Sequence, residues 1–86
     1  MQEATLSASL EDYLEAIFHI QRKKHAARPK DISQFLEVGN SSVTGALKAL
    51  KARKLVNYAP YDVVTLTPTG EEAARDVVRR HESLRE

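Results

Sequence analysis

Residues 29–54 read PKDISQFLEVGNSSVTGALKALKARK, and this stretch decides the fold. Its first part, 30–36, predicts a short helix, because Pro29 suits the first helical position and apolar side chains follow at helical spacing. The expected buried face of this helix consists of Ile32, Phe35 and Leu36. Gly39 and Asn40 tolerate the positive φ of a tight turn, so we expect the helix to stop just before them.

A longer helix is predicted over 41–54, with Asn40 or Ser41 as its cap. The apolar residues that repeat along it at helical spacing are Val43, Ala46, Leu47 and Leu50. Gly45 lies among them, at a cost of about 1 kcal/mol of helix stability relative to alanine. A short helix, a turn containing glycine and a longer helix form the pattern of a helix-turn-helix.

Upstream of this stretch, residues 9–24 predict an amphipathic helix. Its apolar stripe, with one polar edge residue, consists of Leu10, Tyr13, Leu14, Ile17, Phe18 and Gln21. Ser9 is the expected cap and Asp12 the acid of the first turn, while the basic residues 22–24 fall where the helix dipole favours them. Residues 25–28 are expected to form a loop.

Downstream, the pattern changes from helical spacing to β-branched and aromatic runs at 55–58 and 63–66. Because residues 59–62 have turn-forming composition, the two runs predict a hairpin. A final helix is expected to begin at Thr67, as its cap, and Pro68, and to continue towards the C-terminus. The predicted fold is therefore α+β and mostly helical: a winged helix-turn-helix with three helices, a two-stranded wing and a C-terminal fourth helix.

Length and composition are those of one small domain spanning 1–86, in which we expect 1–8 to be flexible and 67–86 to form the fourth helix. The 42% hydrophobic and 29% charged residues indicate a folded chain rather than a disordered one. The chain has no cysteine, which excludes disulfides and thiolate metal sites and fits a reducing cytoplasm. Neither a signal peptide nor an apolar run of membrane length is visible, so we expect a cytoplasmic protein without a membrane partner.

Positive charge gathers in the middle of the chain, where residues 38–61 contain no acid, although the net charge is only +1. In a helix-turn-helix, the second helix enters the major groove of DNA with its N-terminal residues at the base edges. The residues expected at base edges are Asn40, Ser41, Ser42, Thr44 and Gly45, and Lys48, one turn further on, is expected to reach a phosphate or a guanine edge. Those expected near phosphates are Lys51, Arg53 and Lys54, with Asn57, Tyr58 and Tyr61 on the wing. The predicted partner is double-stranded DNA.

Other interpretations remain open at this point. A catalytic function is not expected, because the chain shows neither a nucleophile arranged with His and Asp nor a phosphate-binding Gly-rich loop. A winged helix that serves only protein contacts would share the fold, but the acid-free segment 38–61 favours nucleic acid. A metal-independent winged-helix regulator, for instance of the MarR type, would also share it.

Several segments in the right order resemble the N-terminal domain of the DtxR/MntR family of metal-dependent transcriptional repressors. They are LEDYLEAI at 10–17, DI at 31–32, FL at 35–36, SSVT at 41–44, Tyr58, PY at 60–61, LTPTGEE at 66–72 and RHE at 80–82. The resemblance covers the chain from about residue 9 to its end. It implies a DNA-binding transcriptional repressor regulated by a divalent metal ion. Gly45 departs from the family pattern, in which a larger side chain is common at this position.

The resemblance also implies a metal site made by Asp12 and Glu15 from the first helix and His81 from the fourth. Two carboxylates and an imidazole suit Mn²⁺ or Fe²⁺, and Asp12 indicates the manganese-responsive branch, since the iron branch has methionine there. His19 lies four residues after Glu15 and is a less favoured ligand, and His25 is given no role.

Family members continue into a dimerisation domain that supplies further metal ligands, whereas this chain ends at Glu86. We therefore expect metal binding to be weak or absent and self-association to be weak. An excised domain and a naturally short relative both remain open.

Overall fold

The computed structural model describes residues 8–58 and 63–85, with side chains for 9–58 and 63–80. Along the chain the elements are α1 (Ala8–Lys24), α2 (Pro29–Leu36), α3 (Asn40–Ala52), β1 (Val56–Tyr58), β2 (Val64–Leu66) and α4 (Pro68–Arg85). This is the element order that the sequence predicts. It is a mostly helical winged helix-turn-helix, and its predicted hairpin loop, 59–62, lies outside the described residues.

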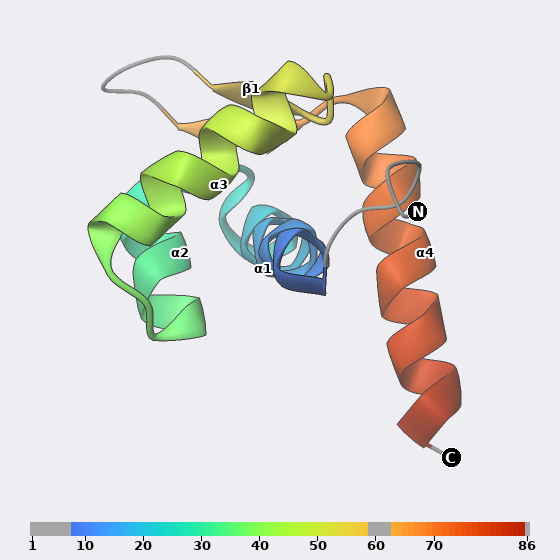
Figure 1. The fold of residues 1–86 in the computed structure, drawn as a ribbon. Coiled ribbons are helices and arrows are strands. Elements are labelled where there is room, and N and C mark those ends of the chain that lie inside the picture. Colours follow the sequence, from blue (N-terminus) through green and yellow to red (C-terminus); the bar gives the residue numbers. More distant parts are fainter. Residues whose placement is uncertain (1–7, 59–62, 86) are drawn as a thin grey trace.

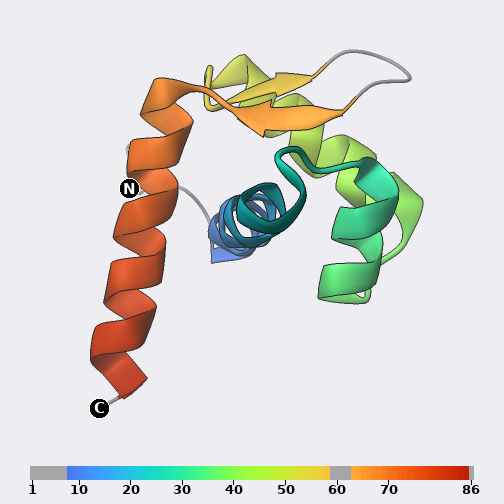
Figure 2. The same cartoon turned by 180° about the vertical axis from the view of Figure 1, so that it is seen from behind.

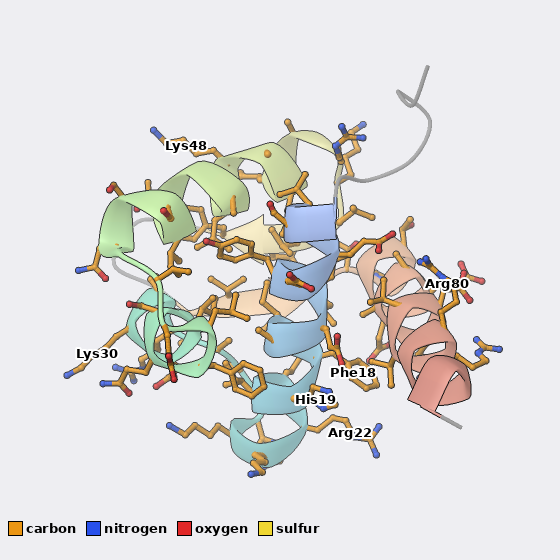
Figure 3. All side chains as sticks on the ribbon, turned by 60° about the horizontal axis from the view of Figure 1, so that its bottom comes forward. Phe18, His19, Arg22, Lys30, Lys48 and Arg80 are labelled. Carbon is orange, nitrogen blue, oxygen red and sulfur yellow. The ribbon has the colours of Figure 1, made fainter. Side chains whose placement is uncertain are left out.

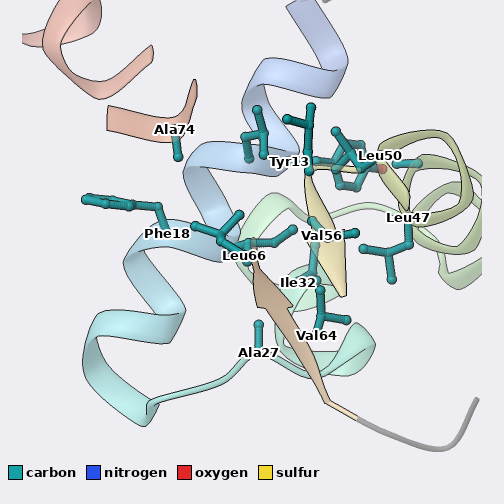
Figure 4. Close-up of a cluster of buried hydrophobic side chains, with 14 of the residues drawn as sticks. Tyr13, Phe18, Ala27, Ile32, Leu47, Leu50, Val56, Val64, Leu66 and Ala74 are labelled. Carbon is teal, nitrogen blue, oxygen red and sulfur yellow. The ribbon is translucent and has the colours of Figure 1, made fainter. Parts of the chain in front are cut away.

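Helix α1 runs through the centre of the molecule, with α4 on one side and the pair α2 and α3 on the other, while the two strands cover one end (Figures 1 and 2). The stripe of α1 faces this surrounding layer: Tyr13, Leu14, Ile17 and Phe18 are buried, and Leu10 and Gln21 at its edges are half-buried. The largest fully buried side chains are Leu14, Ile17, Ile32, Val43, Leu47, Leu50, Val64 and Val77. Figure 4 shows part of this cluster, which draws on every element of the fold.

The two strands pair antiparallel, with Val56 opposite Leu66 and Tyr58 opposite Val64. Ala27 extends this sheet, because its N–H donates to the Val64 carbonyl at 2.9 Å and its own carbonyl accepts the Val64 N–H. The segment 25–28, which the sequence predicts as a loop, thus contributes a buried alanine to the sheet edge. Gln21 binds the sheet as well, since its Oε1 accepts the Leu66 N–H at 2.9 Å.

The ends of the helices agree only partly with the sequence prediction. Thr67 caps α4, because its hydroxyl oxygen accepts the Gly70 N–H at 2.9 Å while its hydroxyl donates to the Lys54 carbonyl at 2.8 Å. At α1 the prediction is wrong by one residue: the helix begins at Ala8, so Ser9 lies inside its first turn. Helix α3 ends at Ala52 rather than 54, because Lys54 adopts a φ of 63° and the chain turns towards β1.

The turn between α2 and α3 corrects two further predictions. The left-handed residue is Glu37, with φ 59° and ψ 50°, whereas Gly39 is extended, with φ −77° and ψ 162°. Gly39 rather than Asn40 or Ser41 occupies the cap position of α3, where no side chain caps the helix. The turn is closed instead by Ser33, whose carbonyl accepts the Val38 N–H at 3.1 Å and whose hydroxyl donates to the Val38 carbonyl at 2.7 Å.

Phe35 is the largest error of the sequence analysis: it is predicted as buried, yet 51% of its surface is exposed. Helix α2 has only two turns, and it packs on α1 and α3 through Ile32 and Leu36. The Phe35 ring lies off this stripe and stacks on the His19 ring, with centroids 6.1 Å apart and an interplanar angle of 21°.

None of the described helices combines the length and the apolar composition that a membrane span requires.

Candidate nucleic-acid interface

Helix α3 presents two chemically different faces. Its inner face is apolar, with Val43, Ala46, Leu47 and Leu50 buried against the core. Its outer face carries small and basic residues that are all exposed: Asn40, Ser41, Ser42, Gly45, Lys48 and Lys51. Side chains three and four residues apart share one side of a helix, so the outer residues form a single surface. The sequence prediction of which residues of α3 face the core is therefore confirmed.

The first turn of α3 carries polar groups and no acid. Thr44 is half-buried, and its hydroxyl donates to the Asn40 carbonyl at 3.0 Å within the helix. Its oxygen keeps lone pairs that can accept a hydrogen bond, but its proton is already used. Ser41 and Ser42 are more exposed and are better placed to act as donors than Thr44.

Gly45 stands in the middle of the outer face with open space around it. A Cβ atom built there would have no atom of the described residues within 4 Å. Packing inside the protein therefore does not explain why a residue that lowers helix stability occupies this position. A surface without a side chain lets another molecule approach the helix backbone closely.

Four basic residues follow the outer face towards the wing: Lys48, Lys51, Arg53 and Lys54, all exposed. In the described part of the chain, none of them lies within ion-pair distance of a carboxylate. Their charges are therefore not neutralised by this part of the protein, so they can attract an external polyanion.

In the described part of the wing, the two candidate phosphate donors are less available than the sequence suggests. The Asn57 side chain donates from Nδ2 to the Thr65 hydroxyl at 3.2 Å across the two strands, and Tyr58 is half-buried. Tyr61 falls outside the described residues, so its expected phosphate contact stays a prediction.

Lys30 is a candidate that the sequence analysis did not assign. It is exposed in the first turn of α2, and in Figure 3 its side chain and that of Lys48 both lie on the side of the molecule away from α4. The available signal was its position, since the first helix of a helix-turn-helix crosses the DNA backbone and its N-terminus favours anions.

The residues of the expected metal site lie on α1 and α4. Asp12 is exposed on α1, and Glu15 is half-buried one turn later, with its Oε2 3.5 Å from Nε2 of His19. His81 belongs to α4, but its side chain lies outside the described residues. The two helices are tied together next to these positions by Arg80, whose Nη2 donates to Oε2 of Glu11 at 3.1 Å.

The described side chains hold no group of three or more His, Cys, Asp or Glu residues able to bind a metal ion. Two of the three expected ligands are thus placed on one helix, and the position of the third side chain stays a prediction. Glu15 and His19 are thus in polar contact on α1 at the helical i, i+4 spacing.

Comparison with protein families agrees with this architecture. Residues 5–64 match the family described as iron dependent repressor, N-terminal DNA binding domain. The crystal structure of IdeR from T. acidophilum aligns with a TM-score of 0.78 and 28% identity, covering 90% of this chain and 35% of that one.

Two curated relatives are similar over most of this chain. An uncharacterized HTH-type transcriptional regulator of Methanocaldococcus jannaschii is 33% identical over 81 residues, 93% of this chain and 65% of that protein. The HTH-type transcriptional regulator MntR of Lysinibacillus sphaericus is 40% identical over 76 residues, 88% of this chain and 55% of that protein. This chain thus spans less than two thirds of either relative.

Proposed function

The chain belongs to the iron-dependent repressor family, as an N-terminal DNA-binding domain, and on this premise we propose that it binds double-stranded DNA through the outer face of α3. In this arrangement Ser41, Ser42 and Gly45 face the base edges of the major groove. Lys48 reaches a guanine edge or a phosphate, and Lys51 binds a phosphate.

One observation carries the proposal: α3 separates a buried apolar face from an exposed face of small and basic residues that no described carboxylate neutralises. A basic surface on a solvated helix is common. An acid-free face of small residues, with an open glycine at its centre, is not needed for solvation, and it suits close contact with a groove.

The test is the salt dependence of binding to a labelled DNA duplex of mixed sequence. Each phosphate contact releases counterions, so losing one contact lowers the slope of log K against log salt concentration by about 0.9. We expect this change for Lys48→Ala and for Lys51→Ala, measured by fluorescence anisotropy at several salt concentrations.

Arg75→Ala is the matched control. Arg75 is exposed on α4, on the other side of α1 from α3, so its loss is expected to leave the slope unchanged (Figures 1 and 2). Equal slopes for the wild type and both lysine variants would contradict the proposed interface.

We further propose that a divalent ion, Mn²⁺ or Fe²⁺, is held by Asp12, Glu15 and His81 and links α1 to α4. The family is metal-dependent, and two carboxylates with an imidazole are a donor set that these ions accept. The Glu11–Arg80 contact supports the proposal, because it brings residue 80 of α4 beside residue 11 of α1. Bound there, the ion would supply positive charge between the two helices. Three protein ligands leave coordination positions for water, so weak binding is expected.

Titration with Mn²⁺ followed by NMR tests this site, because a paramagnetic ion broadens the signals of nearby nuclei. We expect early broadening around Asp12, Glu15 and His81, and its loss in the Asp12→Asn variant. Uniform broadening at all surface acids would reject the site.

A further inference from the structure

Phe35 and His19 form an exposed pair of stacked rings between α1 and α2, with 51% of Phe35 and 41% of the His19 side chain exposed. A cavity of about 330 Å³ opens beside the pair. We call it the α1–α2 groove, and the lining residues that carry the argument are His19, Lys23, Lys24, Asp31, Gln34 and Phe35. We propose that this groove binds an acidic segment of another protein, with one apolar side chain of that segment seated against Phe35.

Folding of the domain accounts for only part of the Phe35 side chain. Helix α2 packs on its neighbours through Ile32 and Leu36, and the Phe35 ring lies beside that contact. Full burial of a phenylalanine side chain contributes about 1.5–3 kcal/mol, of which Phe35 gains only a part because half of its surface stays in water. The ring lines a cavity together with the buried Ile20, so a partner finds apolar surface in a concave place.

The charge around the α1–α2 groove is positive. No acidic residue occurs between Glu15 and Asp31, and this segment carries five exposed basic residues, against four in the longer acid-free segment 38–61. The five are Arg22, Lys23, Lys24, Arg28 and Lys30. A surface of this charge attracts an acidic partner and disfavours a basic one.

Lys23 is an available cation in the lining of the groove. No ion pair among the described residues includes it, whereas Lys24 Nζ lies 3.3 Å from Asp31 Oδ1. The other oxygen of Asp31, Oδ2, accepts the Arg28 N–H at 3.2 Å. Because the carboxylate of the lining already has partners within the protein, Lys23 can bind the carboxylate of another molecule.

The composition of the lining favours a protein over a nucleic acid. Duplex DNA keeps its bases stacked, so outside its grooves it presents phosphates and has nothing apolar to place against Phe35. A single strand can stack a base on an exposed ring. However, Asp31 lines the groove and Glu15 Oε2 lies 3.5 Å from His19 Nε2, and these carboxylates repel phosphates.

A peptide avoids this repulsion. Its acidic side chains can meet Lys23, while its backbone N–H groups can face the carboxylates beside the rings. An apolar anchor in a concave centre, surrounded by a polar and charged rim, is the common form of a protein interface.

The α1–α2 groove and the proposed DNA-binding face are separate surfaces. In Figure 3, Lys48 lies at the top of the view on α3 and His19 lies towards the bottom on α1. A partner seated against His19 and Phe35 therefore leaves the outer face of α3 accessible. The domain could bind this partner and DNA at the same time, and binding of the partner does not depend on binding of DNA.

A displayed library of random peptides tests the proposal without a known partner. The library is selected for binding to the 86-residue chain and depleted on the Phe35→Ala variant. This variant is expected to fold, because Phe35 is half exposed, and circular dichroism checks it. We expect the enriched peptides to be rich in aspartate and glutamate around one aromatic or leucine residue.

The affinity of an enriched peptide, synthesised with a fluorescent label, is then measured by anisotropy. Phe35→Ala and Lys23→Glu are each expected to weaken binding about tenfold, the usual size of an anchor contribution. Replacing the apolar anchor of the peptide by alanine is expected to weaken binding to the same extent.

Lys51→Glu is the matched control, because it reverses an exposed charge on α3. It is expected to weaken DNA binding and to leave peptide affinity unchanged. Lys23→Glu is expected to do the reverse, with the salt dependence of DNA binding as in the wild type.

Several results would overturn the proposal. It fails if no peptide is enriched, or if the enriched peptides bind Phe35→Ala as tightly as the wild type. A single-stranded oligonucleotide of mixed sequence that displaces the peptide, and itself binds more weakly to Phe35→Ala, would assign the groove to nucleic acid. A dimer of the chain in sedimentation that Phe35→Ala dissociates would assign it to a second copy.

Discussion

Gly45 and Gly70 both stand inside helices, but their surroundings are opposite. A Cβ atom on Gly70 would lie 1.8 Å from the Leu55 carbonyl oxygen, whereas one on Gly45 would meet nothing within 4 Å. Both glycines lower helix stability by about 1 kcal/mol relative to alanine. The fold explains Gly70, because α4 must approach the chain closely just before β1. Gly45 lies on the exposed face of α3, so we attribute it to contact with an external partner.

The region around Gly70 has little freedom to adapt. The Leu55 carbonyl that a side chain would strike accepts the Thr67 N–H at 3.1 Å. Thr67 in turn holds Lys54 and Gly70 through its hydroxyl. Relief of the clash would break this set of hydrogen bonds at the start of α4. Among the described residues, the face around Gly45 takes part in no such network, so its residues can change without loss of the fold.

Leu47→Ala tests the rotation of α3 on which the exposure of Gly45 depends. Leu47 is fully buried, so removing its side chain is expected to cost about 2–5 kcal/mol of unfolding free energy, through lost apolar burial and the cavity left behind. Urea denaturation followed by circular dichroism measures it. An alanine variant as stable as the wild type would mean that α3 is rotated from the orientation described.

Gly70→Ala is expected to destabilise the domain by about 3 kcal/mol, near the upper end of overpacking effects, because the clash is with backbone rather than with a flexible side chain. Thr69→Ala is the control, since Thr69 is exposed in the same helical turn. A Gly70→Ala variant with the midpoint of the control would show that the junction can open at no cost.

Gly45→Ala is expected to act in the opposite direction on stability. Alanine has open space and better helix propensity, so the free energy of unfolding rises by up to about 1 kcal/mol. Affinity for duplex DNA is expected to fall, because the new methyl group lies where the groove would approach. Higher stability with unchanged DNA affinity would remove Gly45 from the proposed interface.

Ser42→Ala has the smallest expected effect on folding. Ser42 is exposed, so the change in unfolding free energy should stay within about 0.5 kcal/mol. DNA binding is expected to weaken, since a hydroxyl facing the groove is lost. If instead stability falls and binding does not, Ser42 serves the helix rather than the interface.

A similar contrast separates the features of the fold that could be predicted from those that could not. The order of the elements, the inner face of α3 and the Thr67 cap of α4 could all be predicted, because each depends on residues a few positions apart. The turn after α2 could not be predicted in detail: glycine and asparagine are the usual left-handed residues, yet Glu37 takes that conformation and Gly39 is extended. Local preference was overridden there by the path the chain must follow from α2 to α3.

By itself the sequence determined the helical and strand periods, the position of the helix-turn-helix and the acid-free segment that marks the proposed DNA-binding face. Only the tertiary structure decided that Phe35 stays exposed beside His19, that Ala27 joins the sheet, that Gly70 is required by Leu55, and that Arg80 meets Glu11. The first group depends on spacing along one element, which can be read directly from the residues. The second depends on contacts between elements that are distant in sequence, and these are set only when the helices and strands pack around α1.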